Sequence, residues 1–291
     1  MKRHFALLVL ICIFLCGCVS PTEEADIAAT TLPVYQFTSM LCQGTGLRIV
    51  RLISENVSCL HDYTLQVSQV KSVENADVIV TSGAGLEGFM ENLIHGKTVI
   101  DSSRGIKLHE SCHSHEHGED PHGHDHDQDP HIWLSPINAM VMAKNICAGL
   151  SELYPQYKEL FQGNLDSLLQ QLQHLQSYAE TQLADLSCRD LITFHDGFSY
   201  MAEAFDLHIL AAVEEESGSE ASAKELIELI KLVNQHNLPT VFTETNGSVS
   251  AAGIISVETG KPIFTLDMAM AGEDYFSAMY HNIDTLREAL S

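Results

Sequence analysis

Short apolar runs alternate with helix-compatible stretches in both halves of the chain. The β-prone runs lie at residues 49–53, 76–80, 98–100, 191–194, 209–213, 240–243 and 262–266. The helix-compatible stretches lie at residues 36–42, 86–93 and, most clearly, 223–235. Strands that alternate with helices are typical of parallel sheets in α/β folds. The pattern therefore predicts two α/β lobes, one in each half.

The most regular apolar pattern lies between these two halves. Its positions recur every three or four residues, as on one face of a helix. They are Phe161, Leu165, Leu168, Leu172, Leu175, Ala179, Leu183 and Leu186. A helix from about residue 157 to 186 would run roughly 45 Å. An ordinary amphipathic or coiled-coil helix would give the same stripe, but its place between two α/β lobes favours a rigid spine that permits little hinge motion.

The N-terminus has the pattern of a secretory signal. A short basic start is followed by about 11 apolar residues, too few to span a bilayer, which needs about 20. The run ends in Leu15–Cys16–Gly17–Cys18, which resembles a bacterial lipobox. Cys18 is thus predicted to be the lipidated first residue of a mature protein that is anchored to the membrane outside the cytoplasm.

These patterns predict an order of segments along the chain. The predicted segments are a signal peptide at 1–17, a lipid anchor and tether at 18–27, an N-terminal α/β lobe at 28–155, an interlobe helix at 156–187 and a C-terminal α/β lobe at 188–291. Hydrophobic residues make up 45% of the chain, so both lobes can bury a core.

The formal net charge is −24. Nucleic acid binding needs a basic surface, so this charge argues against a nucleic acid partner. It is compatible with a protein that binds cations.

Five cysteines lie beyond the signal and anchor: Cys42, Cys59, Cys112, Cys147 and Cys188. An exported protein can form disulfides, but an odd number leaves at least one thiol without an intramolecular partner. Cys147 with Cys188 and Cys42 with Cys59 are conceivable pairs. These five include no CxxC pair, which argues against a structural zinc site built from cysteines.

The segment 109–128 differs from its surroundings because histidines alternate with acidic residues and glycine. Its histidines are His109, His113, His115, His117, His122, His124 and His126. With no apolar periodicity, it is predicted to be a solvated loop of the first lobe. It could be a low-affinity antenna for zinc, an acceptor of metal from a partner, or a passive insertion. Alternating histidines give several transient chelates, which favours the antenna.

Four potential metal ligands border predicted strands or their loops: His61, His131, His195 and Asp267. The carboxyl ends of parallel strands converge on the ligand crevice, and each lobe supplies two of the four. Three imidazoles and a carboxylate form a reasonable tetrahedral zinc shell. Glu244, at another strand end, could accept a hydrogen bond from a ligating imidazole or replace a ligand.

Several motifs together resemble the zinc and manganese substrate-binding proteins of bacterial ABC importers. They lie at residues 61–63, 75–77, 83–87, 129–136, 194–196, 242–244 and 265–267. The resemblance runs from about Ala28 to Leu290. It implies a periplasmic-binding-protein-like fold with a helical backbone and a metal site at His61, His131, His195 and Asp267. It also implies a membrane permease and its ATPase as partners, and we expect a monomer.

The residue at position 195 bears on the choice of metal. Manganese-type members of the family tend to have Glu where His195 stands, and imidazole suits zinc better than manganese. Zn²⁺ is therefore the predicted ligand, with Mn²⁺ or iron as the alternative. The chain departs from the family at Met268, where Pro commonly follows the Asp ligand.

Two other classes of protein compete with a non-catalytic receptor. A secreted zinc hydrolase could use three His ligands with Glu244 as the base, but Asp267 would fill the open position that a catalytic zinc needs. No predicted helix carries an HExxH motif. An adhesin would bind host ligands without metal dependence. We predict a binding protein and no enzyme.

Overall fold

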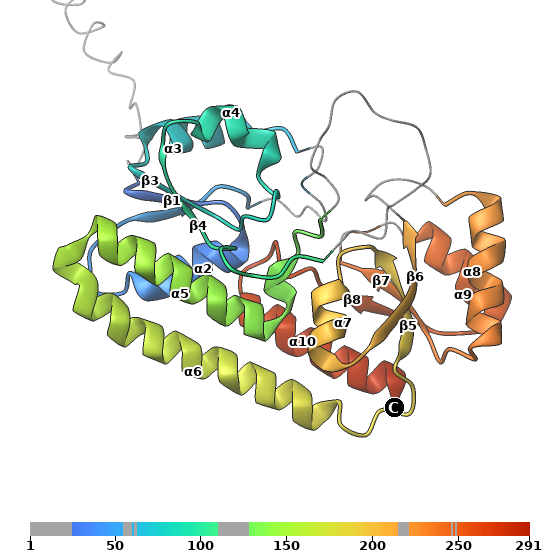
Figure 1. Ribbon diagram of the computed structural model, residues 1–291. Coiled ribbons are helices and arrows are strands. Elements are labelled where there is room, and N and C mark those ends of the chain that lie inside the picture. The colour runs from blue at the N-terminus through green and yellow to red at the C-terminus, as the bar shows by residue number, and fades with distance from the viewer. Residues whose placement is uncertain are drawn as a thin grey trace, which may run out of the picture.

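Two α/β lobes stand above a long helix in the computed structural model (Figure 1). The structure describes residues 25–54, 60, 63–109, 128–214, 221–245, 247 and 249–291. The predicted signal, Cys18, Cys59 and Cys112 lie outside these residues. Among the helices that it describes, none is long and apolar enough to cross a membrane.

The N-terminal lobe contains a parallel sheet with the strand order β2-β1-β3-β4. The strands are β1 (Ile27–Ala29), β2 (Ile49–Arg51), β3 (Val78–Thr81) and β4 (Thr98–Asp101). The two inner strands are fully buried, as expected where helices cover a parallel sheet. The sequence pattern did not predict β1, whose first residue falls within the predicted tether.

Helices surround this sheet. They are α2 (Leu32–Leu41), α3 (Val67–Asn75), α4 (Glu91–Ile94) and α5 (Pro136–Leu153), with short 3-10 turns at Gly88–Met90, Ile132–Leu134 and Pro155–Tyr157. The predicted helical stretch 86–93 is thus divided between a 3-10 turn and α4.

The C-terminal lobe contains two pairs of parallel strands. β5 (Asp190–His195) pairs with β6 (His208–Glu214), and β7 (Val241–Glu244) pairs with β8 (Ile263–Leu266). Its helices are α7 (Ser199–Phe205), α8 (Ala223–Gln235), α9 (Ser250–Thr259) and α10 (Tyr275–Leu290). The predicted helix at 223–235 is confirmed in both bounds.

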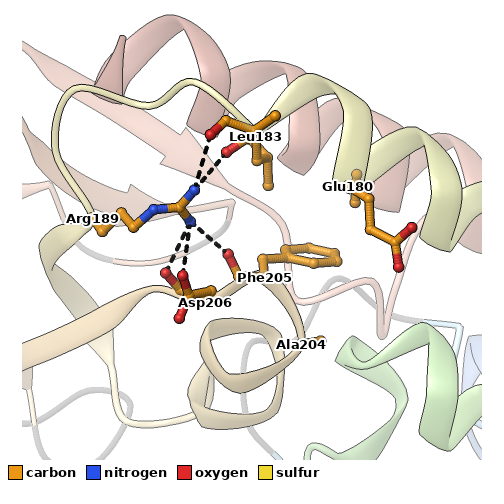
Figure 2. Close-up of a pocket in the computed structure, with 8 residues that line it drawn as sticks. Glu180, Leu183, Arg189, Ala204, Phe205 and Asp206 are labelled. Carbon is orange, nitrogen blue, oxygen red and sulfur yellow. Dashed lines mark hydrogen bonds and ion pairs between the residues drawn. The ribbon is translucent and has the colours of Figure 1, made fainter.

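The spine helix is α6 (Lys158–Gln182), and the apolar stripe predicted from Phe161 to Ala179 is buried. Its end at Gln182 falls short of the predicted residue 186. The Arg189 guanidinium donates to the carbonyl oxygens of Leu183 and Ala184, at 2.9 and 3.3 Å (Figure 2). These bonds satisfy carbonyls that a longer helix would use itself, so the helix ends there.

One apolar core continues from the N-terminal lobe through α6 into α10, and it includes Phe37, Leu172 and Tyr275. The Trp133 indole N–H donates to the carbonyl of Met268 (2.7 Å), and the Tyr275 hydroxyl donates to the carbonyl of Trp133 (2.7 Å). A second core, which includes Val241, lies within the C-terminal lobe. The shared core thus packs both lobes against the spine, and these two bonds join the lobes directly.

Cys42, Cys147 and Cys188 are free thiols. Both conceivable disulfides, Cys147 with Cys188 and Cys42 with Cys59, include a cysteine that is free here. Neither pairing is therefore present in the structure.

Candidate metal centre

His131 and His195 face each other where the two lobes meet. His131 precedes the 3-10 turn Ile132–Leu134, and His195 is the last residue of β5. Their ring centroids are 5.3 Å apart with an interplanar angle of 87°, and the residues are 2% and 4% exposed. Two of the predicted ligands, one from each lobe, are thus brought together in a buried place.

Gly197 allows this close approach. A Cβ at this position would lie 2.9 Å from His131 Nδ1, 2.9 Å from His195 Cδ2 and 2.7 Å from Met268 Cε. Real Cβ atoms essentially never approach other atoms so closely. Met268, the departure from the family pattern, therefore packs beside the imidazole pair, and its carbonyl accepts the hydrogen bond from Trp133.

Asp129 forms two hydrogen bonds with His131. Its Oδ1 accepts hydrogen bonds from the backbone N–H of His131 (2.9 Å) and from His131 Nδ1 (2.8 Å). Burial opposes ionisation of Asp129, but the hydrogen bonds from His131 and Ser199 outweigh burial, so the pKa of Asp129 lies below its ordinary value. An ionised carboxylate accepts a proton-bearing Nδ1 and leaves Nε2 of His131 for a metal.

The first turn of α7 reaches Asp129 from the other lobe. Ser199 Oγ donates to Asp129 Oδ2, and the Tyr200 hydroxyl donates to the Asp129 carbonyl (2.8 Å). Burial raises the pKa of Tyr200 to about 12, so its phenol keeps the proton it donates. Asp129 is therefore held on both its carboxylate and its backbone.

His109, the first histidine of the His-rich segment, packs on the same helix. Its ring stacks on Tyr200, with centroids 4.2 Å apart. Its Nδ1 lies 3.0 Å from Ser199 Oγ, and its Nε2 lies 2.8 Å from a carboxylate oxygen of Glu203. The backbone N–H of Asp129 donates to the His109 carbonyl (3.0 Å), so the two ends of the segment are joined.

Asp267 directly follows β8, as predicted. The side chain of Asn282 on α10 bonds both the N–H and the carbonyl of Asp267, each at 2.7 Å. Asp267 Oδ1 accepts the N–H of Ala269 (2.7 Å). The main chain of Asp267 is thus fixed against α10.

Glu244 is the last residue of β7 and is 2% exposed. It lies in register with Leu266 of β8, one residue before Asp267. The carboxyl ends of β5, β7 and β8 therefore carry His195, Glu244 and Asp267 respectively, which confirms the predicted strand-end positions of these residues.

The described residues do not gather three or more His, Cys, Asp or Glu side chains into a group that could hold a metal ion. Asp267 and Glu244 are therefore not assembled with the imidazole pair into one ligand set. His61 and the histidines from His113 to His126 lie outside the residues that the structure describes.

Several residues that support this centre carry little or no signal in the sequence. Asp129 belongs to the motif around His131, and its place two residues before that histidine was the available signal. Gly197, Ser199 and Asn282 carry no such signal, because their contacts come from other elements.

A model of one family matches most of the chain. Residues 27–289 match the family described as zinc-uptake complex component A, periplasmic (ZnuA). The chain belongs to this family. The resemblance inferred from the motifs is thereby confirmed.

Similar proteins agree with this membership. The zinc-binding lipoprotein AdcA of Streptococcus pneumoniae is 30% identical over 99% of this chain and 61% of its own length. The chain thus spans only part of that relative. A crystal structure of ZnuA is 29% identical with a TM-score of 0.79, covering 92% of this chain and 100% of that one. The Zn(II)-bound ZnuA-like domain of the pneumococcal AdcA is 26% identical with a TM-score of 0.75, covering 92% and 99%.

Proposed function

We propose that the chain is the extracytoplasmic receptor of an ABC importer, which captures Zn²⁺ between its lobes and delivers it to a membrane permease and its ATPase. The facing, buried imidazoles of His131 and His195 carry this proposal. His61 and Asp267 would complete the ligand set, with Glu244 as an acceptor for a ligating imidazole or as a substitute ligand.

The ligand chemistry favours zinc over manganese. Imidazole nitrogen suits Zn²⁺, whereas Mn²⁺ prefers carboxylate and other oxygen ligands. A Cβ at Gly197 would lie 2.9 Å from an atom of each imidazole, so glycine leaves both rings their places. A manganese or iron receptor of the same family remains the alternative.

The proposed activity is binding and release, without catalysis. A lipid at Cys18 would keep the protein, acting as a monomer, close to its permease. The His-rich segment would concentrate zinc near the cleft, with His109 fixed on α7 at one end of it. A hydrolase would instead show metal-dependent turnover, and an adhesin would bind host ligands without metal.

Calorimetry with zinc and manganese on the mature protein tests the proposal, together with elemental analysis. The matched variant lacks residues 110–127, with a short glycine-serine link between His109 and Gln128. We expect one tight zinc per chain in both proteins, undisplaced by excess manganese. A preference for manganese would overturn the metal assignment, and loss of tight binding in the deletion variant would overturn the site.

A further inference from the structure

The bonds between α7 and Asp129 cross from one lobe to the other. Asp129 and His131 belong to the N-terminal lobe, whereas Ser199 and Tyr200 form the first turn of α7 in the C-terminal lobe. Asp129 is 3% exposed, so these partners replace water around it. The environment of His131 is therefore shared between the lobes.

We propose that Ser199 and Tyr200 are positioning residues for His131: they hold Asp129 across the lobe interface and thereby fix which imidazole nitrogen of His131 carries the hydrogen and which is left for a metal. This inference rests on the proposed function, since it concerns a ligand of that site. Neither residue is among the proposed metal ligands, and both act through Asp129.

Counting donors and acceptors assigns a donor and an acceptor to each hydrogen bond around Asp129. An ionised carboxylate only accepts, so His131 Nδ1 and Ser199 Oγ must each give it a hydrogen. The one hydroxyl hydrogen of Ser199 is then used, and its oxygen accepts from His109 Nδ1 (3.0 Å). The tautomer of His131 with its hydrogen on Nδ1 is thus the one that the network supports.

Both donors are held in place by α7 and its neighbours. Tyr200 is fixed on one side by the stacked ring of His109, whose backbone N–H donates to the Tyr200 hydroxyl (3.0 Å). At the other end of α7, Arg189 donates to the carbonyl of Phe205 (3.2 Å). A hydroxyl on a helix fixed at both ends orients the carboxylate more firmly than one on a free loop.

A Ser199→Ala, Tyr200→Phe double variant and a Ser199→Thr variant separate positioning from a merely structural role. Ser199→Ala and Tyr200→Phe remove one hydroxyl each with little change of shape, and Ser199→Thr keeps a hydroxyl at the same position. Calorimetry would measure zinc affinity, and thermal unfolding would report any loss of fold. Long-range ¹H–¹⁵N NMR of the metal-free protein at alkaline pH, where imidazoles are neutral, would report the His131 tautomer.

We expect wild-type His131 to carry its hydrogen on Nδ1, and the Ser199→Ala, Tyr200→Phe double variant to populate the other tautomer. Zinc affinity should fall about tenfold in the double variant, the lower end of what lost partners of ligating histidines cost. Ser199→Thr should retain the wild-type tautomer and affinity.

The inference would be overturned if the double variant kept the wild-type tautomer of His131 and the wild-type zinc affinity. This holds whether or not its thermal stability fell. If the wild-type protein bound no zinc, the proposed function would fail. The tautomer measurement on the metal-free protein would still decide whether Ser199 and Tyr200 position His131.

Discussion

Single residues set the spacing of the imidazole pair. Gly197 is one of them, because no space is left beside it for a side chain. Gly197→Ala would push a methyl group against two rings that cannot bend and against Met268 Cε. We expect zinc affinity to fall at least about tenfold and stability to fall by about 1–3 kcal/mol, the usual cost of overpacking. Calorimetry and urea unfolding would measure the two effects.

Gly253→Ala is the matched control for this change. Gly253 lies on α9 in the same lobe, and a Cβ there would have no atom within 4 Å. It should leave zinc affinity unchanged. Equal affinities for the Gly197→Ala variant and the control would mean that the rings have room that the structure does not show.

Glu87 is a buried carboxyl group away from the imidazole pair. Its Oε1 accepts from the Thr30 hydroxyl (2.6 Å) and the Ser82 N–H (2.7 Å), and its Oε2 accepts from the Gly83 N–H (3.0 Å). Burial raises its pKa from 4.5 to about 7, although these hydrogen bonds favour the charged form. Glu87 therefore connects the carboxyl ends of β1 and β3 through hydrogen bonds, although burial disfavours the charged form of its carboxyl group.

The raised pKa of Glu87 predicts how stability changes with pH. Between pH 4.5 and 7 the unfolded chain ionises Glu87 while the folded protein keeps it protonated. Its stabilising contribution is therefore complete below pH 4.5 and is lost as the pH rises to about 7. At 1.36 kcal/mol for each pKa unit, the loss is about 3 kcal/mol.

Urea unfolding of the wild type and Glu87→Gln across this pH range tests the prediction. The free energy of unfolding of the wild type should fall by about 3 kcal/mol more than that of the variant. Glu91→Gln, at an exposed position on α4, should follow the wild-type profile. Parallel profiles for the wild type and Glu87→Gln would show that Glu87 titrates alike in both states.

At the scale of elements, Arg189 connects the end of the spine to α7. Its guanidinium donates to Leu183 and Ala184 at the end of α6, and to Phe205 and Asp206 at the end of α7 (Figure 2). A planar guanidinium can bond two pairs of carbonyls at once, whereas an ammonium cannot span them. Arg189 thus fixes α7 relative to α6.

We expect Arg189→Lys to lower the free energy of unfolding by roughly 2 kcal/mol, within the range for hydrogen bonds to charged groups. Arg48→Lys is the control, because Arg48 is 55% exposed and its ion pair with Asp26 is on the surface. Chemical unfolding would compare the variants. If the two substitutions cost the same, Arg189 would be only a surface residue.

Long periodic elements could be predicted from the sequence, and elements defined by tertiary contacts could not. The stripe in α6 and the amphipathic α8 were recognised because their periodicity extends over several turns. β1 has three residues and no alternation, and its strand partners lie far away in the sequence. The end of α6 depends on Arg189, which no local pattern reveals.

The same distinction holds for the candidate site. His195, Glu244 and Asp267 were found because they end or follow apolar strands, and parallel strands bring such ends to one edge. Ser199 and Asn282 were missed because each acts on a residue from another element, Asp129 and Asp267 respectively. A single sequence carries no record of those contacts.

For the whole molecule, we expect metal binding between the lobes to raise global stability, because the lobes share one core. His131 and His195 come from different lobes, so an ion bound by both is lost when either lobe unfolds. A ligand that binds only the folded state adds about 2.7 kcal/mol of stability at a free concentration of 100 times its Kd. Zinc should therefore raise the unfolding free energy of the wild type by about this amount.

The variants in this experiment locate the stabilising site. His131→Ala and His195→Ala should each lose most of the zinc-dependent stabilisation at the same free zinc concentration. His95→Ala, at an exposed position after α4, and the deletion of residues 110–127 should keep it. Urea unfolding at a fixed, buffered zinc concentration would measure all five proteins. If the deletion removed the stabilisation while His131→Ala retained it, the ion would be bound by the His-rich segment and not between the lobes.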